Sequence, residues 1–151
     1  MKVVIQRIKN ASVSVEDREI SAAKEGFLLL VGIDKTDKNE NIENMAKKIA
    51  KMRIFEDEQG KMNLDIVQTQ GEILSVPQFT LNARTGKGNR PGFDNAADPE
   101  QAKNLWIKFN DFLKSYGIKV KEGVFGSHMK VKLVNDGPVT FVLEEFSGTG
   151  R

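Results

Sequence analysis

The side chains that usually carry hydrolytic or metal chemistry are almost absent from this chain. It contains no cysteine, and His128, expected at the surface, is its single histidine. A thiolate nucleophile, a cysteine-based zinc site and a Ser-His-Asp triad therefore lack their raw material. If the chain is a hydrolase, it must act through backbone groups, hydroxyls, carboxylates or a group on its substrate. We expect neither a metal nor a cofactor.

A Gly-Pro pair near the C-terminus is the first candidate for backbone chemistry. Two alternating apolar runs fill residues 131–143, and the residues between them are typical of a β-hairpin turn, with Gly137 and Pro138 at its tip. Proline has no N–H, so the carbonyl oxygens of such a tip have few local donors and are free to accept from another molecule. An ordinary surface turn is the alternative interpretation.

A second candidate lies where a buried strand ends. The segment 71–76 has the composition of a strand that stops near Pro77, which cannot donate to a sheet. The loop 82–93 that follows is polar and glycine-rich, and it carries three cations with no anion between them, Arg84, Lys87 and Arg90. Such a loop suits phosphate, although it lacks the spacing of a P-loop. A mobile surface loop is the alternative.

Two further charged groups are ambiguous. Arg7 shares a strand face with Val3 and Ile5, so it either binds carbonyl or carboxylate oxygens as a clamp or extends to water from the strand end. The acidic residues 56–58 could attract a hard cation, but the alternating oxygen ligands of a calcium loop are missing.

Several strands must position these residues. Segments 2–8 and 11–15 alternate in the manner of a first hairpin, and the apolar run 27–31 predicts a central strand covered on both faces. Segments 118–121 and 129–133 alternate apolar residues with lysines, which predicts two strands whose lysines face solvent as a second basic surface.

Two helices are predicted. The first starts at a capping box formed by Asp37 and Glu40 and continues with apolar residues at helical spacing, namely Ile42, Met45, Ala46, Ile49 and Met52. The second has Asp98 at its N-cap followed by proline, presents a wide aromatic face, and stops at Gly117.

Length and charge bound the organisation of the chain. Its 151 residues fit one domain, 1–146, followed by a frayed tail, 147–151. The net charge of +2 is too small to indicate a nucleic-acid binder without local clusters. No apolar run approaches a membrane span, so we expect a cytoplasmic protein with no membrane partner.

Two of these segments together resemble the signatures of the D-aminoacyl-tRNA deacylases. The family has Ser-Gln-Phe-Thr-Leu and Asn-x-Gly-Pro-Val-Thr, and this chain has 77–81 and 135–140, with Pro77 in place of the serine. The likeness covers nearly the whole chain. Pro77 removes a hydroxyl and an N–H, so any role of that serine is not carried over.

The resemblance implies a fold and a reaction. The fold would be a single α/β domain of mainly antiparallel strands curled into a barrel-like sheet with two packed helices, working as a homodimer. The reaction would be hydrolysis of D-aminoacyl-tRNA to a free D-amino acid and tRNA. The N–H groups of Phe79 and Thr80 would form an oxyanion hole, and the vicinal 2′-hydroxyl of the terminal adenosine would assist in place of an acid-base side chain. A nucleophilic Thr80 is the alternative, although no evident base would activate it.

The resemblance also implies how chirality is recognised. A cis Gly137-Pro138 turn from the partner subunit would bind the α-ammonium through its carbonyl oxygens and exclude an L side chain, while glycine would still be hydrolysed. Other family roles fall on Arg7, which would hold that turn, on Gln78 and Met129 as pocket walls, and on Arg84, Lys87 and Arg90 with the strand lysines, which would hold the acceptor stem through phosphates.

Two rival functions stay open from the sequence. One is the same fold acting on another mischarged substrate, glycine or L-alanine on the wrong tRNA; the Pro before Gln78 resembles the branch that removes L-alanine, whereas Phe79 and Val139-Thr140 do not. The other is a non-catalytic RNA-binding module that uses the basic loop and the lysine-bearing strands.

Overall fold

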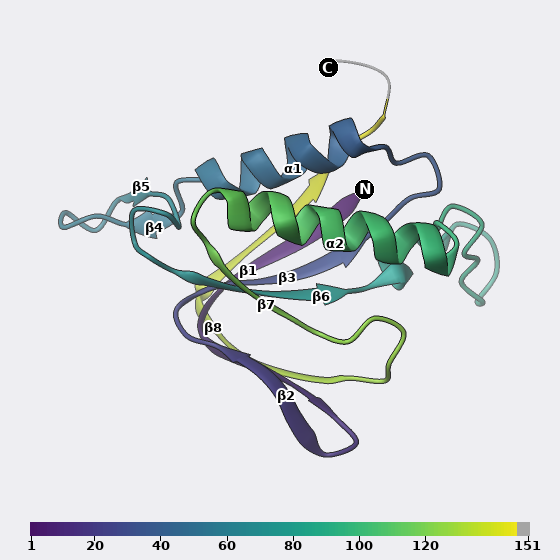
Figure 1. Ribbon diagram of the computed structural model, residues 1–151, viewed down its shortest axis with the longest axis horizontal. Helices are drawn as coiled ribbons and strands as arrows, with labels where there is room; N and C mark the ends of the chain where they lie inside the picture. Colours follow the sequence, from purple (N-terminus) through teal and green to yellow (C-terminus); the bar gives the residue numbers. More distant parts are fainter. Residues whose placement is uncertain (148–151) are drawn as a thin grey trace.

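Two helices lie side by side across one face of a six-stranded mixed sheet in the computed structural model, which describes residues 1–147 (Figure 1). The sheet has the order β2-β1-β3-β6-β7, and β8 also pairs with β1. Its strands are β1 (Lys2–Val15), β2 (Arg18–Ala23), β3 (Gly26–Gly32), β6 (Glu72–Pro77), β7 (Lys119–Glu122) and β8 (Lys130–Glu144). A separate antiparallel pair is formed by β4 (Phe55–Glu56) and β5 (Met62–Leu64), and the helices are α1 (Asn39–Lys51) and α2 (Pro99–Ser115).

The predicted α/β class is confirmed. Strand β1 pairs antiparallel with β2, β3 and β8, whereas β3, β6 and β7 run parallel to one another. The sheet curls strongly, because the Ser21 hydroxyl of β2 donates to the carbonyl of Glu122 on β7 at 2.8 Å. This contact brings the two ends of the strand order together, as a barrel-like sheet requires.

The first predicted hairpin is wrong in its position. Segments 2–8 and 11–15 form one continuous strand, β1, and the chain reverses only at Glu16 and Asp17, which have φ of 51° and 61°. Adjacent Arg7 and Ile8 are both buried, so the inward face of the strand switches there and the strand bends. The polar residues after Ile8 resemble a turn in the sequence, but they mark this bend.

The second predicted hairpin is also wrong. Strand β8 pairs with β1 along its whole length, from Glu144 opposite Lys2 to Lys130 opposite Ser14. Asn135 pairs with Ile8 and Thr140 with Gln6, so the residues 136–139 bulge out of the ladder opposite a single residue of β1. Bulges and hairpin tips use the same residue types, which is why the local sequence did not distinguish them.

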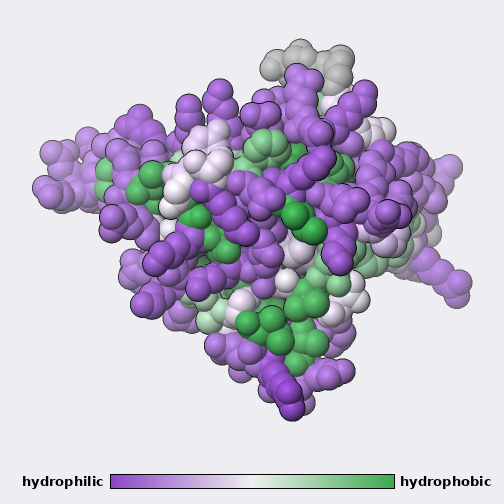
Figure 2. Space-filling model, viewed as in Figure 1, coloured by the Kyte–Doolittle hydropathy of each residue, from purple (hydrophilic) through white to green (hydrophobic). Residues whose placement is uncertain are grey.

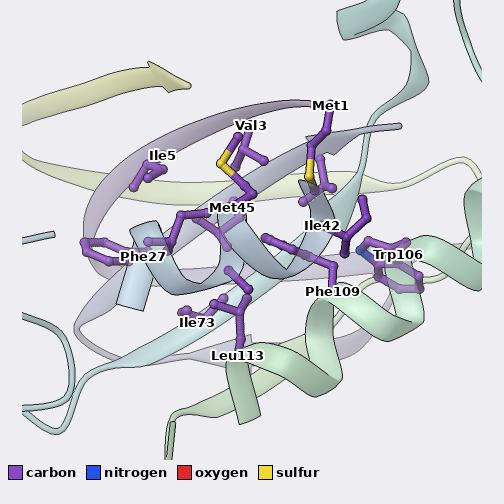
Figure 3. Packing of buried hydrophobic residues seen from close by; sticks show 14 of the residues in the cluster. Met1, Val3, Ile5, Phe27, Ile42, Met45, Ile73, Trp106, Phe109 and Leu113 are labelled. Carbon is purple, nitrogen blue, oxygen red and sulfur yellow. The ribbon is translucent and has the colours of Figure 1, made fainter. Parts of the chain in front are cut away.

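Two hydrophobic clusters cover the two faces of the central strands. The larger lies between the sheet and the helices, where Phe27, Ile73, Met45 and Phe109 meet (Figure 3). The smaller is enclosed by the curl of the sheet and contains Ile8, Ala11, Val13, Ala23, Leu28, Leu74 and Val76. Because both faces of β3 and β6 are buried, the prediction of a central strand is confirmed. The outer side of the helices is mostly hydrophilic (Figure 2).

The second helix begins as predicted, but the first does not. The Asp98 side chain accepts from the N–H of Gln101 at 3.1 Å, and Gly117 follows the helix with a φ of 83°. In α1 the N-cap is Lys38, and Asp37 lies buried before it. Asp37 instead accepts from the Met1 ammonium at 2.8 Å and from the Asp34 N–H at 2.6 Å. The local pattern predicts that the Asp37 carboxylate caps α1, but in the fold this carboxylate binds the distant Met1 ammonium instead.

The last described residue, Ser147, contacts the loop before α1. Ser147 donates to the carbonyl of Thr36 at 2.6 Å, while the rest of the predicted tail, 148–151, lies outside the described residues. None of the helices within residues 1–147 combines the length and apolar character needed to cross a membrane.

Candidate active site

The turn that follows β6 presents free backbone donors. It is a short 3₁₀ helix, η1 (Phe79–Asn82), anchored to the sheet by the Gln78 N–H, which donates to the carbonyl of Val31 at 2.7 Å. The Leu81 N–H closes the turn on the carbonyl of Gln78 at 3.3 Å. Within residues 1–147, the N–H groups of Phe79 and Thr80 have no acceptor, as is usual in the first turn of a helix. Two adjacent free donors can bind a negatively charged oxygen.

The Thr80 hydroxyl has no activating base. Among the described residues, its hydrogen-bond partners are the side-chain amide of Gln78 at 2.5 Å and no other group. An amide nitrogen is a donor and cannot remove a proton from a hydroxyl. This arrangement suits a threonine whose backbone acts, and it gives no support to a nucleophilic hydroxyl.

Aromatic and basic groups surround this turn. The exposed rings of Phe79 and Phe93 meet edge to face with centroids 5.0 Å apart. The basic loop is tied at its base by the reciprocal hydrogen bonds of Arg84 and Gly92, at 2.7 and 3.0 Å. Arg84, Lys87 and Arg90 are exposed, and none forms an ion pair with another residue in the described part of the chain.

Met129 belongs to the same end of the molecule. A Cβ added at Gly123 would lie 2.9 Å from the Met129 sulfur and 3.6 Å from Cδ of Pro77. Gly123 therefore lies between Met129 and Pro77 and is close to both. The Val124 N–H also points to the sulfur, at 3.4 Å. The structure therefore brings Met129 next to the end of β6, where Gln78 begins the turn.

Arg7 and the bulge of β8 form a second constellation. The Arg7 side chain is buried, and it donates from Nε to the carbonyl of Asp136 at 2.9 Å and from Nη1 to the carbonyl of Ile54 at 2.8 Å. The interpretation of Arg7 as a clamp is correct, and extension to water is wrong. Beside it, Gly137 and Pro138 are exposed and joined by a cis peptide bond.

A cleft of about 820 Å³ opens beside this constellation. Its lining contains both cations and carboxylates, namely Arg7, Lys9, Lys24, Glu25, Glu56, Glu72 and Asp136. Lys9 bridges two of the carboxylates, at 3.3 Å from Glu25 and 3.6 Å from Asp136, and these neighbours raise its pKa. The cleft carries charges of both signs, so it does not by itself select a ligand.

The two constellations lie far apart in one chain. The turn meets β3 at Val31, whereas Arg7 lies opposite Phe27. The four strand residues from Phe27 to Val31 correspond to about 13 Å along the strands, and the three strand spacings from β8 to β6 correspond to about 14 Å across them. Gly137 and Pro138 therefore cannot reach the Gln78–Thr80 turn of their own chain.

Within the acidic residues 56–58, Asp57 has structural partners. The Asp57 carboxylate accepts from the N–H groups of Gln59 and Lys61, at 2.9 and 3.0 Å, and these bonds lower its pKa. Residues 1–147 contain no group of three or more histidine, aspartate or glutamate side chains that could hold a metal ion.

Sequence reasoning assigned no role to two residues that the structure places at these constellations. Phe93 packs on Phe79, and Asn135 hydrogen-bonds across the bulge. Asn135 begins the signature segment 135–140, and Phe93 ends the basic loop 82–93; these positions were the signal for them in the sequence.

Comparisons with known proteins identify the family and support the fold. D-aminoacyl-tRNA deacylases of Staphylococcus epidermidis and Staphylococcus haemolyticus are each 51% identical to the chain over 98% of both lengths. A solved structure named c-Myc DNA Unwinding Element Binding Protein is 42% identical, with a TM-score of 0.90 over 95% of this chain and 98% of that one. A probable eukaryotic D-amino acid tRNA deacylase, only 16% identical, shares the fold with a TM-score of 0.82 over 94% of this chain and 97% of that one. The family model described as D-Tyr-tRNA(Tyr) deacylase matches residues 4–144, and the chain belongs to that family.

Proposed function

We propose that this chain hydrolyses the ester bond of D-aminoacyl-tRNA and releases a free D-amino acid and tRNA. Family membership and the names of relatives that are 51% identical over nearly the full length support this activity. The observation that carries the proposal is that the N–H groups of Phe79 and Thr80, at an exposed turn, have no acceptor among the residues that the structure describes.

The free donors suit the charge that develops in ester hydrolysis. Attack of water on the ester carbonyl places negative charge on its oxygen, and two preorganised N–H groups stabilise that oxyanion. The chain supplies no histidine or cysteine at the turn. The vicinal 2′-hydroxyl of the terminal adenosine therefore assists the water, and the reaction needs neither a metal nor a cofactor.

Stereochemical selection comes from a second copy of the chain. The carbonyl oxygens of Gly137 and Pro138 accept from the substrate α-ammonium and occupy the space into which an L side chain would project. Because the dipeptide cannot reach its own turn, the complete site belongs to a homodimer, with Arg7 holding the dipeptide from behind. A substrate with no side chain is not excluded, so glycine on tRNA is also hydrolysed.

The remaining site residues hold the tRNA end. Gln78 and Met129 line the pocket, and Arg84, Lys87 and Arg90 contact phosphates without reading the base sequence. The lysine-bearing strands β7 and β8 extend this basic surface. Charged tRNA is a substrate of the translation apparatus, so we place the reaction in the cytoplasm.

A deacylation assay on matched enantiomers tests the activity. D- and L-tyrosyl-tRNA are incubated with the protein and a chelator, and release of the amino acid is followed. We expect rapid loss of the D ester only. Equal cleavage of both esters, or a requirement for metal, would contradict the mechanism. Sedimentation of the protein that gives only a species of one-chain mass at working concentration would contradict the shared site.

Two alternatives have specific support. Pro77 in place of serine keeps proofreading of L-alanine on the wrong tRNA under consideration, and L-alanyl-tRNA serves as a third substrate in the same assay. The name of the 42% identical structure, a DNA unwinding element binding protein, favours nucleic-acid binding, and a chain with that function alone would be non-catalytic. That function predicts salt-sensitive binding of uncharged tRNA and no ester cleavage at any enzyme concentration.

A further inference from the structure

We propose that Asn135 is a positioning residue that fixes the direction of the Gly137 and Pro138 carbonyl oxygens, and thereby the preference for D over L substrates. The inference rests on the proposed function. It starts from the interruption of the β1–β8 ladder, in which residues 136–139 have no partner on β1. A backbone that leaves a ladder needs other groups to hold it.

The Asn135 side chain supplies these groups on the far side of the dipeptide. Its Oδ1 accepts from the N–H of Val139 at 2.7 Å, and its Nδ2 donates to Thr140 Oγ1 at 2.9 Å and to the carbonyl of Val139 at 3.4 Å. Val139 is buried and this contact is partly buried, so without Asn135 the N–H would lose its protein partner where access to water is limited. One carboxamide therefore closes the bulge.

Arg7 supplies the complementary contact on the near side. Its guanidinium binds the carbonyl of Asp136, immediately before Gly137, while Asn135 binds the N–H of Val139, immediately after Pro138. The exposed dipeptide lies between these two fixed points, and neither of its residues has a ladder partner on β1. The ladder pairs of Asn135 with Ile8 and of Thr140 with Gln6 anchor the ends of the bulge, and the two side-chain contacts fix the peptide groups that flank the dipeptide.

This arrangement makes a prediction that a general structural role does not. If Asn135 only stabilised the fold, its loss would lower hydrolysis of D and L esters by the same factor. If it fixes the carbonyl direction, its loss will lower the D rate and relieve exclusion of the L side chain, so the ratio of the two kcat/KM values will fall.

The test compares Asn135→Ala, Asn135→Asp and Thr140→Val with the wild-type homodimer on D- and L-tyrosyl-tRNA. We expect Asn135→Ala to lower the D/L ratio of kcat/KM about tenfold, the usual effect of losing one well-formed hydrogen bond. Asn135→Asp keeps the acceptor for the Val139 N–H and should restore most of the ratio. Thr140→Val removes only one contact and should produce a smaller decrease. The control Asn104→Ala, exposed on α2, should leave the ratio unchanged.

Amide hydrogen exchange of Val139 gives a second readout that needs no activity. Protection of this N–H should be lost in Asn135→Ala and kept in Asn135→Asp. An unchanged D/L ratio in a folded Asn135→Ala variant, or equal losses for both enantiomers, would overturn the inference. If Asn135→Ala does not fold, the folded Thr140→Val variant replaces it, and a D/L ratio in that variant equal to that of the wild type would overturn the inference as well. If the wild type cleaves neither ester, the proposed function itself fails, and normal Val139 exchange distinguishes that outcome from a misfolded bulge.

Discussion

The two halves of the proposed site are built from opposite backbone groups. The turn after β6 offers N–H donors that have no acceptor within residues 1–147, whereas the bulge of β8 offers carbonyl oxygens of residues that have no ladder partner on β1. Few side chains support the donor turn, and in the described part of the chain only the Gln78 amide reaches the Thr80 hydroxyl. The acceptor bulge is held from two sides by Arg7 and Asn135.

This difference follows from what each half must do. Donors in the first turn of a helix are fixed by the helical geometry itself and need little help. Carbonyl oxygens in a bulge have no such geometry, so side chains must fix their direction. We therefore expect changes in the donor turn to affect the rate of hydrolysis and changes behind the bulge to affect the choice between enantiomers.

The largest expected effect comes from removing one donor. Thr80→Pro deletes the N–H, and we expect kcat for D-tyrosyl-tRNA to fall about 100- to 1,000-fold, as when an oxyanion-hole donor is lost. Thr80→Ala keeps the N–H and should change kcat little. Single-turnover deacylation, with thermal unfolding to verify the fold, measures both. Equal damage by the two substitutions would indicate that the hydroxyl is the nucleophile.

A weaker clamp behind the bulge should change selectivity more than rate. Arg7→Lys keeps the positive charge but loses the planar fork, so it can bind only one of the carbonyls of Ile54 and Asp136. We expect the D/L ratio of kcat/KM to fall about 10- to 100-fold, the effect of losing a hydrogen bond to a charged group. Competition assays with both esters measure the ratio. A ratio equal to that of the wild type would show that the clamp does not set chirality.

The basic loop should affect affinity for tRNA without affecting either half of the site. In the triple variant Arg84→Gln, Lys87→Gln and Arg90→Gln, we expect KM to rise about tenfold near physiological salt and the dependence of log KM on log salt to become shallower by about two to three. The D/L ratio should stay the same. The exposed Lys108→Gln on α2 is the matched control, and an equal rise in its KM would make the loop effect non-specific.

The smallest effect on the site is expected from a change in the core. Asp37→Ala removes the carboxylate that pairs with the Met1 ammonium and that accepts from Asp34 and Asn41, and only the carbonyl of Glu145 still accepts from the ammonium among the described residues. It should lower the free energy of unfolding by about 3–5 kcal/mol. Burial raises the pKa of the Asp37 carboxyl, so removal of its charge is well tolerated while removal of its oxygens is not. Asp37→Asn should therefore cost much less than Asp37→Ala.

The contribution of Asp37 to the free energy of unfolding depends on pH. Because the pKa of Asp37 is higher in the folded chain, the folded state binds the proton more tightly, and this group's contribution to stability decreases as pH rises from the ordinary carboxyl pKa to the raised value. Asp37→Asn should lack that decrease. Urea titrations of the wild type and both variants at several pH values measure this decrease in stability. A D/L ratio that changes in either variant would show that the core and the site are coupled.

The sequence by itself determined the local features and the excluded chemistry. The missing cysteines and the single histidine excluded a conventional triad, Asp98 and Gly117 marked the ends of α2, and the two signature segments identified the family. These features depend on neighbouring residues, whose caps, turns and periodicity are local physical properties.

Only the tertiary structure decided how the distant segments are arranged. It made β1 and β8 continuous partners, placed Arg7 on the carbonyls of Ile54 and Asp136, and separated the two halves of the site in one chain. Strand register and long-range contacts depend on which remote surfaces are buried together, so a bulge has the same local sequence as a hairpin tip. For the same reason, no pattern near Asp37 could indicate that the Met1 ammonium, far along the chain, would be its partner.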